Sequence, residues 1–154
     1  MQEKKIPKAL YLLPVLCLII FGWLGTQLYR DAFAAFSSRS WPTASGTVIR
    51  SEWKHYGGKG CHYGLILRYS YVVDGATYVG GNYRFGGECD DSVMQVVGEH
   101  PVGSTLRVHY KPEAPDQSVI AAGELSGNTK FGLVLVPFMM LLGIFLFLMV
   151  RRRS

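Results

Sequence analysis

Two long uncharged runs of apolar residues, 9–28 and 131–150, dominate the hydrophobic pattern of the chain. A helix rises about 1.5 Å per residue, so runs of this length match the hydrocarbon core of a bilayer, which is about 30 Å thick. Each run therefore predicts a transmembrane helix. Pro14 and Pro137 fall inside the runs, where a proline can kink a helix. Neither run contains an ionisable side chain, which argues against a pump or a transporter.

Between the runs, the pattern changes to the alternation of apolar and polar residues that is typical of β-strands. The alternation is clearest from Leu65 to Val73, and Asp74-Gly75 follows as the signal of a two-residue hairpin turn. A return strand is expected to begin at Ala76. Further strands are predicted at residues 46–53, 105–110 and 118–121.

A single short helix is expected between the strands. It would have an apolar side of Val93, Met94, Val96 and Val97, an N-cap at Asp90 or Asp91, and an end at Gly98. Five strands and one helix predict a small barrel or roll. The expected fold class is therefore membrane α plus β, with two transmembrane helices flanking one small β-rich domain.

The same pattern predicts the domain organisation. The expected parts are a cytoplasmic N-terminus (1–8), a transmembrane helix (9–28), a connector (29–40), an extracytoplasmic β-rich domain (41–125), a connector (126–130), a transmembrane helix (131–150) and a cytoplasmic C-terminus (151–154).

The net charge of +5 is carried by the two ends of the chain. The charged residues there are Lys4, Lys5, Lys8 and Glu3 before the first run, and Arg151, Arg152 and Arg153 after the second. Basic residues next to apolar spans stay on the cytoplasmic side of a membrane. We therefore expect both termini to be cytoplasmic and residues 29–130 to be extracytoplasmic. The middle segment has equal numbers of acidic and basic residues, which argues against a nucleic-acid partner.

A cleaved export signal is an alternative for the first run. The basic residues before it and Ala32-Phe33-Ala34 after it fit such a signal. Export signals usually have a shorter apolar region, of about 7–15 residues. The length therefore favours retention of the first span, and the sequence leaves cleavage open.

Cys61 and Cys89 are the only cysteines between the runs, and each follows glycines. In an oxidising compartment two such cysteines usually pair, and the bond would stabilise the domain by about 3–4 kcal/mol. A weaker alternative is a zinc site formed by His55, Cys61, His62 and Cys89, although their spacing matches no standard zinc motif. No catalytic residue and no cofactor are expected.

Several turn and strand motifs resemble an uncharacterised bacterial domain-of-unknown-function family of small two-span membrane proteins. These motifs are Trp41-Pro42-Thr43-Ala44-Ser45-Gly46-Thr47-Val48, Tyr69 to Gly75 with Tyr78, Pro101-Val102-Gly103, and Val108-His109-Tyr110-Lys111-Pro112 with Pro115 and residues 118–120. The resemblance implies a protein of the bacterial inner membrane with an extracytoplasmic β-rich domain. It implies no catalytic residues. Cys61 and Cys89 lie outside the family pattern, so the disulfide expectation depends on the compartment alone.

The expected function is that of a non-enzymatic two-pass membrane protein whose β-domain binds a partner protein. It would act as an accessory subunit, scaffold, regulator or immunity protein of an envelope complex, or associate as a homo-oligomer. The candidate contact residues are the aromatic side chains Trp53, Tyr56, Tyr63 and Tyr83, because aromatic residues anchor interfaces. The alternative is an envelope sensor that binds a ligand or metal ion through the loops around Cys61 and Cys89.

Overall fold

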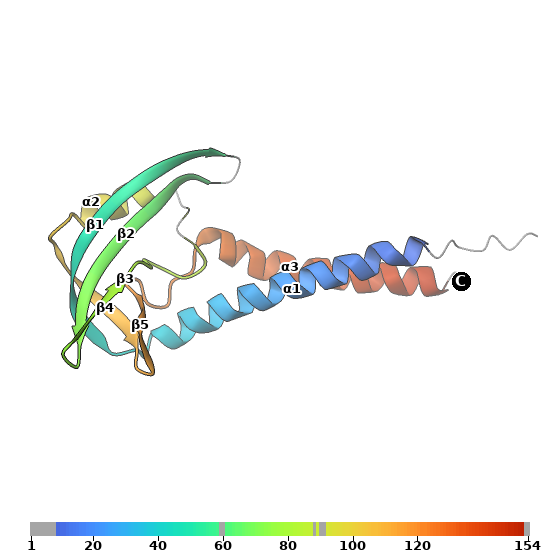
Figure 1. The fold of residues 1–154 in the computed structure, drawn as a ribbon. Helices are drawn as coiled ribbons and strands as arrows, with labels where there is room; N and C mark the ends of the chain where they lie inside the picture. The colour runs from blue at the N-terminus through green and yellow to red at the C-terminus, as the bar shows by residue number, and fades with distance from the viewer. Residues whose placement is uncertain (1–8, 59–60, 88, 90–91, 153–154) are drawn as a thin grey trace, which may run out of the picture. The chain divides into compact units, whose positions relative to one another are not determined.

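The computed structural model describes residues 9–58, 61–87, 89 and 92–152. The backbone divides into two compact units, residues 1–30 with 130–154 and residues 31–129. We call them the helical unit and the β-rich unit after their described residues. Two long helices, α1 (Ala9–Ser38) and α3 (Gly127–Arg152), supply the helical unit (Figure 1). Within it they pack against each other at glycines. A Cβ atom added to Gly132 would lie 3.1 Å from the Leu28 side chain, and one added to Gly143 would lie 3.3 Å from Leu18.

The expectation of two flanking transmembrane helices is wrong. Among the described residues, one helix is long and apolar enough to cross a membrane, the Gly127–Met149 part of α3, with a mean hydropathy of 2.7. The first apolar run is instead the first part of a 30-residue helix that continues through Arg30 and Asp31. No proline or glycine follows Leu28 within that helix, and Ala32, Ala34 and Ala35 are strong helix formers. Most of the expected connector 29–40 is therefore helical.

The β-rich unit contains one antiparallel sheet of five strands (Figure 1). The strands are β1 (Thr43–Gly58), β2 (Cys61–Val73), β3 (Ala76–Gly80), β4 (Thr105–Lys111) and β5 (Ala114–Val119). Their order across the sheet is β3-β2-β1-β4-β5. β1 is thus the central strand. The antiparallel neighbours β1–β2, β2–β3 and β4–β5 are each consecutive in sequence.

The hairpin predicted at Asp74-Gly75 is confirmed. Asp74 and Gly75 have φ angles of 49° and 80°, as the two central residues of a type I′ turn require. Tyr71 lies opposite Tyr78 in the register, and their rings stack with centroids 5.8 Å apart. Aromatic cross-strand pairs of this kind add about 0.2–1 kcal/mol to sheet stability.

The core lies against one face of β2. The inward side chains of this strand, Leu65, Leu67, Tyr69, Tyr71 and Val73, are all buried, as their alternation predicts. The short helix α2 (Val93–Glu99) covers part of them with its buried Val93 and Val96. Its N-cap position is held by Ser92. The caps expected at Asp90 or Asp91 lie outside the described residues.

The sheet curls until its two edge strands, β3 and β5, come into contact. The segments that follow them are joined by backbone hydrogen bonds. The amide of Ala121 donates to the carbonyl of Tyr83 at 2.7 Å, and the amide of Ser126 donates to that of Phe85 at 2.9 Å. Ser126 also caps α3, because its hydroxyl accepts from the Thr129 amide at 3.3 Å. These contacts hold the residues that line the pocket described below.

Candidate functional site

Two features of the β-rich unit are candidates for binding: a two-stranded ribbon and a pocket. We call residues 50–58 of β1 and 61–68 of β2 the β1–β2 ribbon. It extends beyond the rest of the sheet, because β4 pairs only with Thr43–Thr47 and β3 pairs only with Tyr69–Val73 (Figure 1). Isolated two-stranded ribbons are marginally stable in water, so this one depends on side-chain packing between its strands and on the packing of Leu65 and Leu67 into the core.

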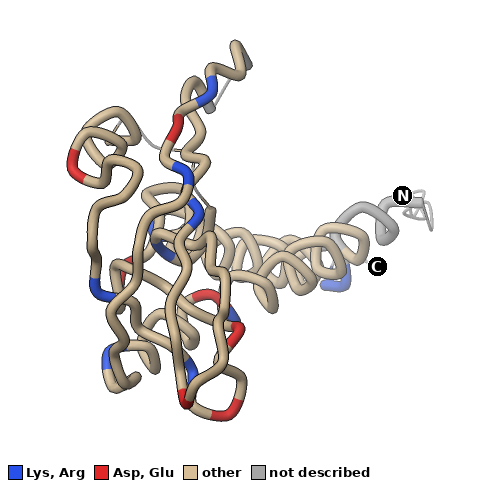
Figure 2. The backbone as a smooth tube through the Cα atoms, turned by 60° about the vertical axis from the view of Figure 1, so that its left-hand side comes forward, with Lys and Arg blue, Asp and Glu red and all other residues tan. Residues whose placement is uncertain are grey.

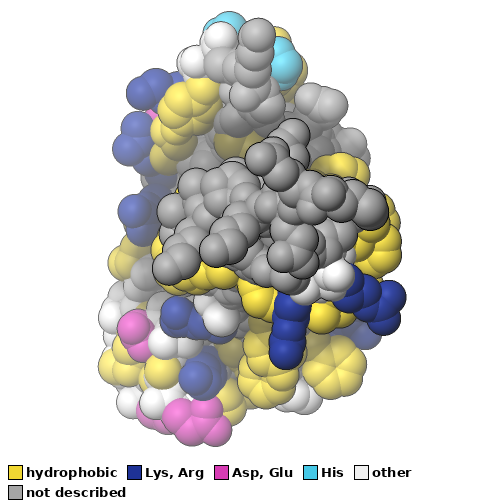
Figure 3. Space-filling model, turned by 90° about the vertical axis from the view of Figure 1, so that its right-hand side faces the viewer, with side chains coloured by type: hydrophobic (Ala, Val, Ile, Leu, Met, Phe, Trp, Pro, Cys, Tyr) yellow, Lys and Arg dark blue, Asp and Glu magenta, His cyan; other side chains and the backbone are white. Residues whose placement is uncertain are grey.

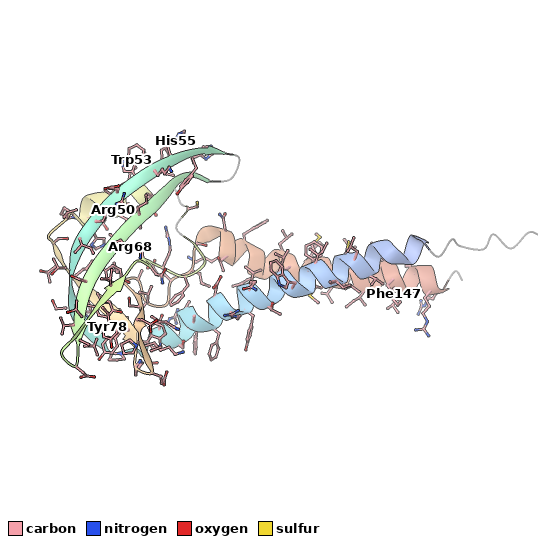
Figure 4. The ribbon with its side chains drawn as sticks, viewed as in Figure 1. Arg50, Trp53, His55, Arg68, Tyr78 and Phe147 are labelled. Carbon is pink, nitrogen blue, oxygen red and sulfur yellow. The ribbon has the colours of Figure 1, made fainter. Side chains whose placement is uncertain are left out.

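One face of the ribbon ends in a cluster of rings. Trp53 and His55 on β1 lie opposite Leu65 and Tyr63 on β2. The Tyr63 ring meets Trp53 edge-to-face with centroids 5.6 Å apart, and the His55 ring lies 5.3 Å away. Figure 4 shows Trp53 and His55 toward the tip of the ribbon. The Trp53 side chain is nevertheless 48 % exposed, so a large part of this ring is available for contact.

The opposite face of the ribbon carries Tyr56, which is 55 % exposed. Its ring lies over Gly64, where an added Cβ atom would be 2.5 Å from the ring. The Lys54 ammonium is 5.5 Å from the centre of the same ring, within the range of a cation–π contact. Gly64 therefore provides the space in which Tyr56 lies flat against the strand.

The same face is basic toward the base of the ribbon. Arg50 lies opposite Arg68 in the register, and the Arg50 guanidinium donates to the Glu52 carboxylate at 2.9 Å. This hydrogen bond lowers the pKa of Glu52 and raises that of Arg50. Basic positions predominate along the ribbon in Figure 2, and Figure 3 shows exposed hydrophobic side chains beside Lys and Arg on the β-rich unit.

The structure places three of the four aromatic residues predicted to contact a partner on one ribbon, with Tyr56 on the opposite face from Trp53 and Tyr63. Trp53, Tyr56 and Tyr63 all belong to the ribbon. Tyr83 lies in the segment after β3, where it packs half-buried against the core and its ring is 5.8 Å from the His100 ring. Its expected role as a contact residue has less support, because it is used in internal packing.

The predicted disulfide involves a residue that is only partly described. Cys89 forms an isolated backbone bridge with Gly64, which brings the chain around Cys89 alongside the start of β2. Cys61 is the first residue of that strand, but its side chain lies outside the described part of the structure. The pairing therefore stays a prediction.

The alternative zinc site receives no support from the ribbon geometry. His55 is paired with Tyr63, so the alternation of side chains places His62 on the other face from His55. Among the described residues, no group of three or more His, Cys, Asp or Glu side chains could hold a metal ion. The loops around Cys61 and Cys89 include residues 59, 60, 88, 90 and 91, which lie outside the described residues.

A pocket of about 620 Å³ opens where α1 ends. We call it the α1-exit pocket. One wall is formed by the last turns of α1 and Trp41, a second by Asn82 and Phe85, and a third by the β4–β5 hairpin between Lys111 and Ser118. Its volume falls within the range of about 300–1,000 Å³ that is usual for small-molecule sites.

Hydrogen bonds and ring packing hold the walls of this pocket. The Trp41 amide donates to the Ser38 carbonyl at 3.1 Å, and the Trp41 ring meets the Phe85 ring edge-to-face at 6.1 Å. The Asn82 amide group donates to the Ser118 carbonyl at 3.4 Å. The pocket was not predicted from the sequence. Trp41 and Lys111 were both part of recognised motifs, but nothing in a linear motif indicates that residues 70 positions apart line one cavity.

Comparison with known protein families now identifies the β-rich unit. The model of the Domain of unknown function (DUF3592) matches residues 44–125, more than half of the 154-residue chain. The chain belongs to the DUF3592 family. The DUF3592 match begins at the second residue of β1 and ends before α3, so it includes α2 and all of the sheet except Thr43. It confirms the resemblance to an uncharacterised domain family. Neither a curated protein nor a solved structure matches the chain significantly.

Proposed function

We propose that this DUF3592 protein is a non-enzymatic, membrane-attached binding protein whose β1–β2 ribbon docks onto a partner protein. The observation that carries the proposal is the exposure of Trp53 and Tyr56, 48 % and 55 %, on opposite faces of a ribbon that extends from the sheet. Aromatic side chains and arginine are enriched among the residues that dominate binding energy. The ribbon supplies both kinds, and its basic face suits a partner with an acidic surface.

Attachment to a membrane is supported by α3. Only 11 % of its apolar window is buried, so this helix is not the core of a soluble domain. Its last turn carries Arg151 and Arg152. We therefore propose that α3 crosses a bacterial cytoplasmic membrane with these arginines on the inner side. The β-rich unit, which precedes α3 in the chain, would then be extracytoplasmic.

An extracytoplasmic location makes a Cys61–Cys89 disulfide part of the same proposal. The Gly64–Cys89 bridge supports it, since it places Cys89 near the start of β2. Alkylation of the denatured, unreduced protein tests it. We expect one labelled thiol per chain, that of Cys17, which is a free cysteine. Three labelled thiols in protein isolated under acid quench would contradict the pairing.

The docking proposal is tested by photo-cross-linking in cells. A photoreactive phenylalanine analogue replaces Trp53 or Tyr56 in the full chain, and Val102 serves as a matched control. Val102 is 64 % exposed but lies in the turn before β4. We expect an adduct of one discrete mass from the two ribbon positions and none from position 102.

A second variant links the adduct to the aromatic surface. With the cross-linker at position 56, Trp53→Ala should reduce the yield of the adduct at least about fivefold if the Trp53 ring is a binding hot spot. An adduct of twice the chain mass would identify a second copy as the partner. No adduct, or the same adducts from position 102, would refute docking by the ribbon.

A further inference from the structure

The charged residues of the α1-exit pocket have both signs. Lys111 and Glu113 lie in the β4–β5 hairpin, and Asp116 lies on β5. Among the described residues, the only ion pair is Arg50–Glu52, so these three groups do not neutralise one another directly. A ligand of a single sign would leave at least one of them unpaired. A zwitterion would pair with both signs, and charge-assisted hydrogen bonds are the stronger kind.

The pocket is also lined by aromatic rings, beside several polar side chains. Phe33, Trp41 and Phe85 line it, and the Phe33 side chain is 62 % exposed. A small zwitterion that is soluble in water would leave these rings in contact with solvent. A ligand that also has an apolar part would cover them and gain the free energy of apolar burial.

The position of the pocket in the chain indicates the source of such a ligand. Phe33 and Ala34 belong to α1, and the residues from Val15 to Leu24 in the same helix include many exposed apolar side chains. α1 also packs against α3, the helix that could cross a membrane, at Leu28 and Gly132. A membrane lipid is therefore an amphiphile whose chemistry suits both the pocket and the helix from which Phe33 and Ala34 come.

We infer that the α1-exit pocket binds the zwitterionic headgroup of an aminophospholipid. Glu113 and Asp116 take the ammonium group, and Lys111 takes the phosphate. Phe33, Trp41 and Phe85 contact the glycerol and the first carbons of the acyl chains. This inference rests on the proposed membrane attachment but not on docking by the β1–β2 ribbon, because the two sets of residues do not overlap.

Native mass spectrometry of the full chain in detergent tests the inference. The protein is exposed to equal amounts of phosphatidylethanolamine and phosphatidylglycerol with the same acyl chains. We expect wild-type protein to retain the ethanolamine lipid at least about fivefold more, since only its headgroup offers an ammonium group to Glu113 and Asp116. Equal retention of the two lipids would overturn the inference.

Substitutions assign the preference to the pocket. Asp116→Asn and Glu113→Gln should each lower the ratio of retained lipids at least about threefold, whereas Asp74→Asn should leave it unchanged. Asp74 is a matched control because asparagine also tolerates the φ of 49° at that turn. A ratio that is insensitive to both pocket substitutions would refute the assignment. Unchanged unfolding midpoints show that the variants are folded.

A competition experiment separates a lipid from a free zwitterion. Soluble glycerophosphoethanolamine should displace the bound lipid only at about a hundredfold excess, because it lacks the apolar part that contacts the rings. Displacement at equimolar concentration would overturn lipid recognition. The cross-linking from position 56 should be the same in Asp116→Asn as in wild type, so failure of this inference can be distinguished from failure of ribbon docking.

Discussion

Arg50 on β1 lies directly opposite Arg68 on β2, so two guanidinium groups of like charge share one face of the ribbon (Figure 4). Like charges at directly opposed positions destabilise a sheet by about 0.2–1 kcal/mol. Glu52 offsets part of this repulsion through its hydrogen bond with Arg50. The arrangement is costly in the free protein and would be relieved by an acidic partner.

Removal of one member of this pair should stabilise the protein. We expect Arg68→Gln to raise the free energy of unfolding by about 0.2–1 kcal/mol, with a smaller gain at high ionic strength. Arg107→Gln is the matched control, because Arg107 lies opposite Ser45 and faces no arginine across the strands. Urea denaturation at low and high salt measures both. Equal effects of the two substitutions would contradict the repulsion.

Tyr69 on β2 and Ser118 on the edge strand β5 are in contact within the curled sheet. The Tyr69 hydroxyl lies 3.1 Å from the Ser118 hydroxyl, and the two residues are 0 % and 4 % exposed. Tyr69→Phe should lower the free energy of unfolding by about 1–3 kcal/mol, because it leaves a buried hydroxyl without this partner. Ser118→Ala should lower the free energy of unfolding less in the Tyr69→Phe variant than in wild type. A double-mutant cycle measures this difference.

Tyr78→Phe is the control for that cycle. Its ring stacks on Tyr71, but among the described residues its hydroxyl forms no hydrogen bond. We expect Tyr78→Phe to change the free energy of unfolding by no more than about 0.5 kcal/mol. A loss as large as that of Tyr69→Phe would show that any hydroxyl removed from this cluster is equally costly.

Gly80 gives the Tyr69–Ser118 contact its space. A Cβ atom at position 80 would overlap both the Tyr69 ring and the Ser118 hydroxyl. Gly80→Ala should therefore lower the free energy of unfolding by about 1–3 kcal/mol, the usual cost of overpacking. Gly98→Ala should instead raise it by about 0.5–1 kcal/mol, since Gly98 lies in α2 with no atom within 4 Å of its Cβ position. Thermal unfolding of the two variants should shift in opposite directions.

Tyr71 should make stability depend on alkaline pH. Burial raises the pKa of its hydroxyl, an effect that the hydrogen bond with Ser118 partly opposes and the nearby Asp116 charge reinforces. The folded protein therefore keeps this proton at a pH where the unfolded chain has begun to lose it. This contribution is complete below the unfolded pKa, near about 10, and is lost as the pH rises through the folded pKa.

The variant Tyr71→Phe has no such proton to release. Its free energy of unfolding should fall less steeply than that of wild type between about pH 9 and 11. The variant also loses the hydrogen bond to the Pro115 carbonyl, which lowers its stability at all pH values without changing the slope. Parallel curves for the two proteins would contradict the role of Tyr71.

Elements with local causes could be predicted from the sequence. The type I′ turn at Asp74-Gly75 needs only two residues that tolerate positive φ, and both have it. The alternation from Leu65 to Val73 correctly indicated which side chains are buried, because the two faces of a strand differ in solvent contact. The end of the first helix could not be predicted from the end of the apolar run, since charged residues such as Arg30 and Asp31 do not by themselves end a helix.

By itself, therefore, the sequence determined the short helix α2, the hairpin at Asp74-Gly75 and the inward face of β2, whose causes lie within a few residues of each other. Only the tertiary structure decided that Trp41 lies against Phe85, that Tyr69 reaches Ser118 and that Lys111 shares a pocket with Phe33. Such contacts depend on how far the sheet curls and where α1 ends. Both are set by packing over the whole domain, because burial rewards the best total fit of many side chains and no short segment encodes that fit.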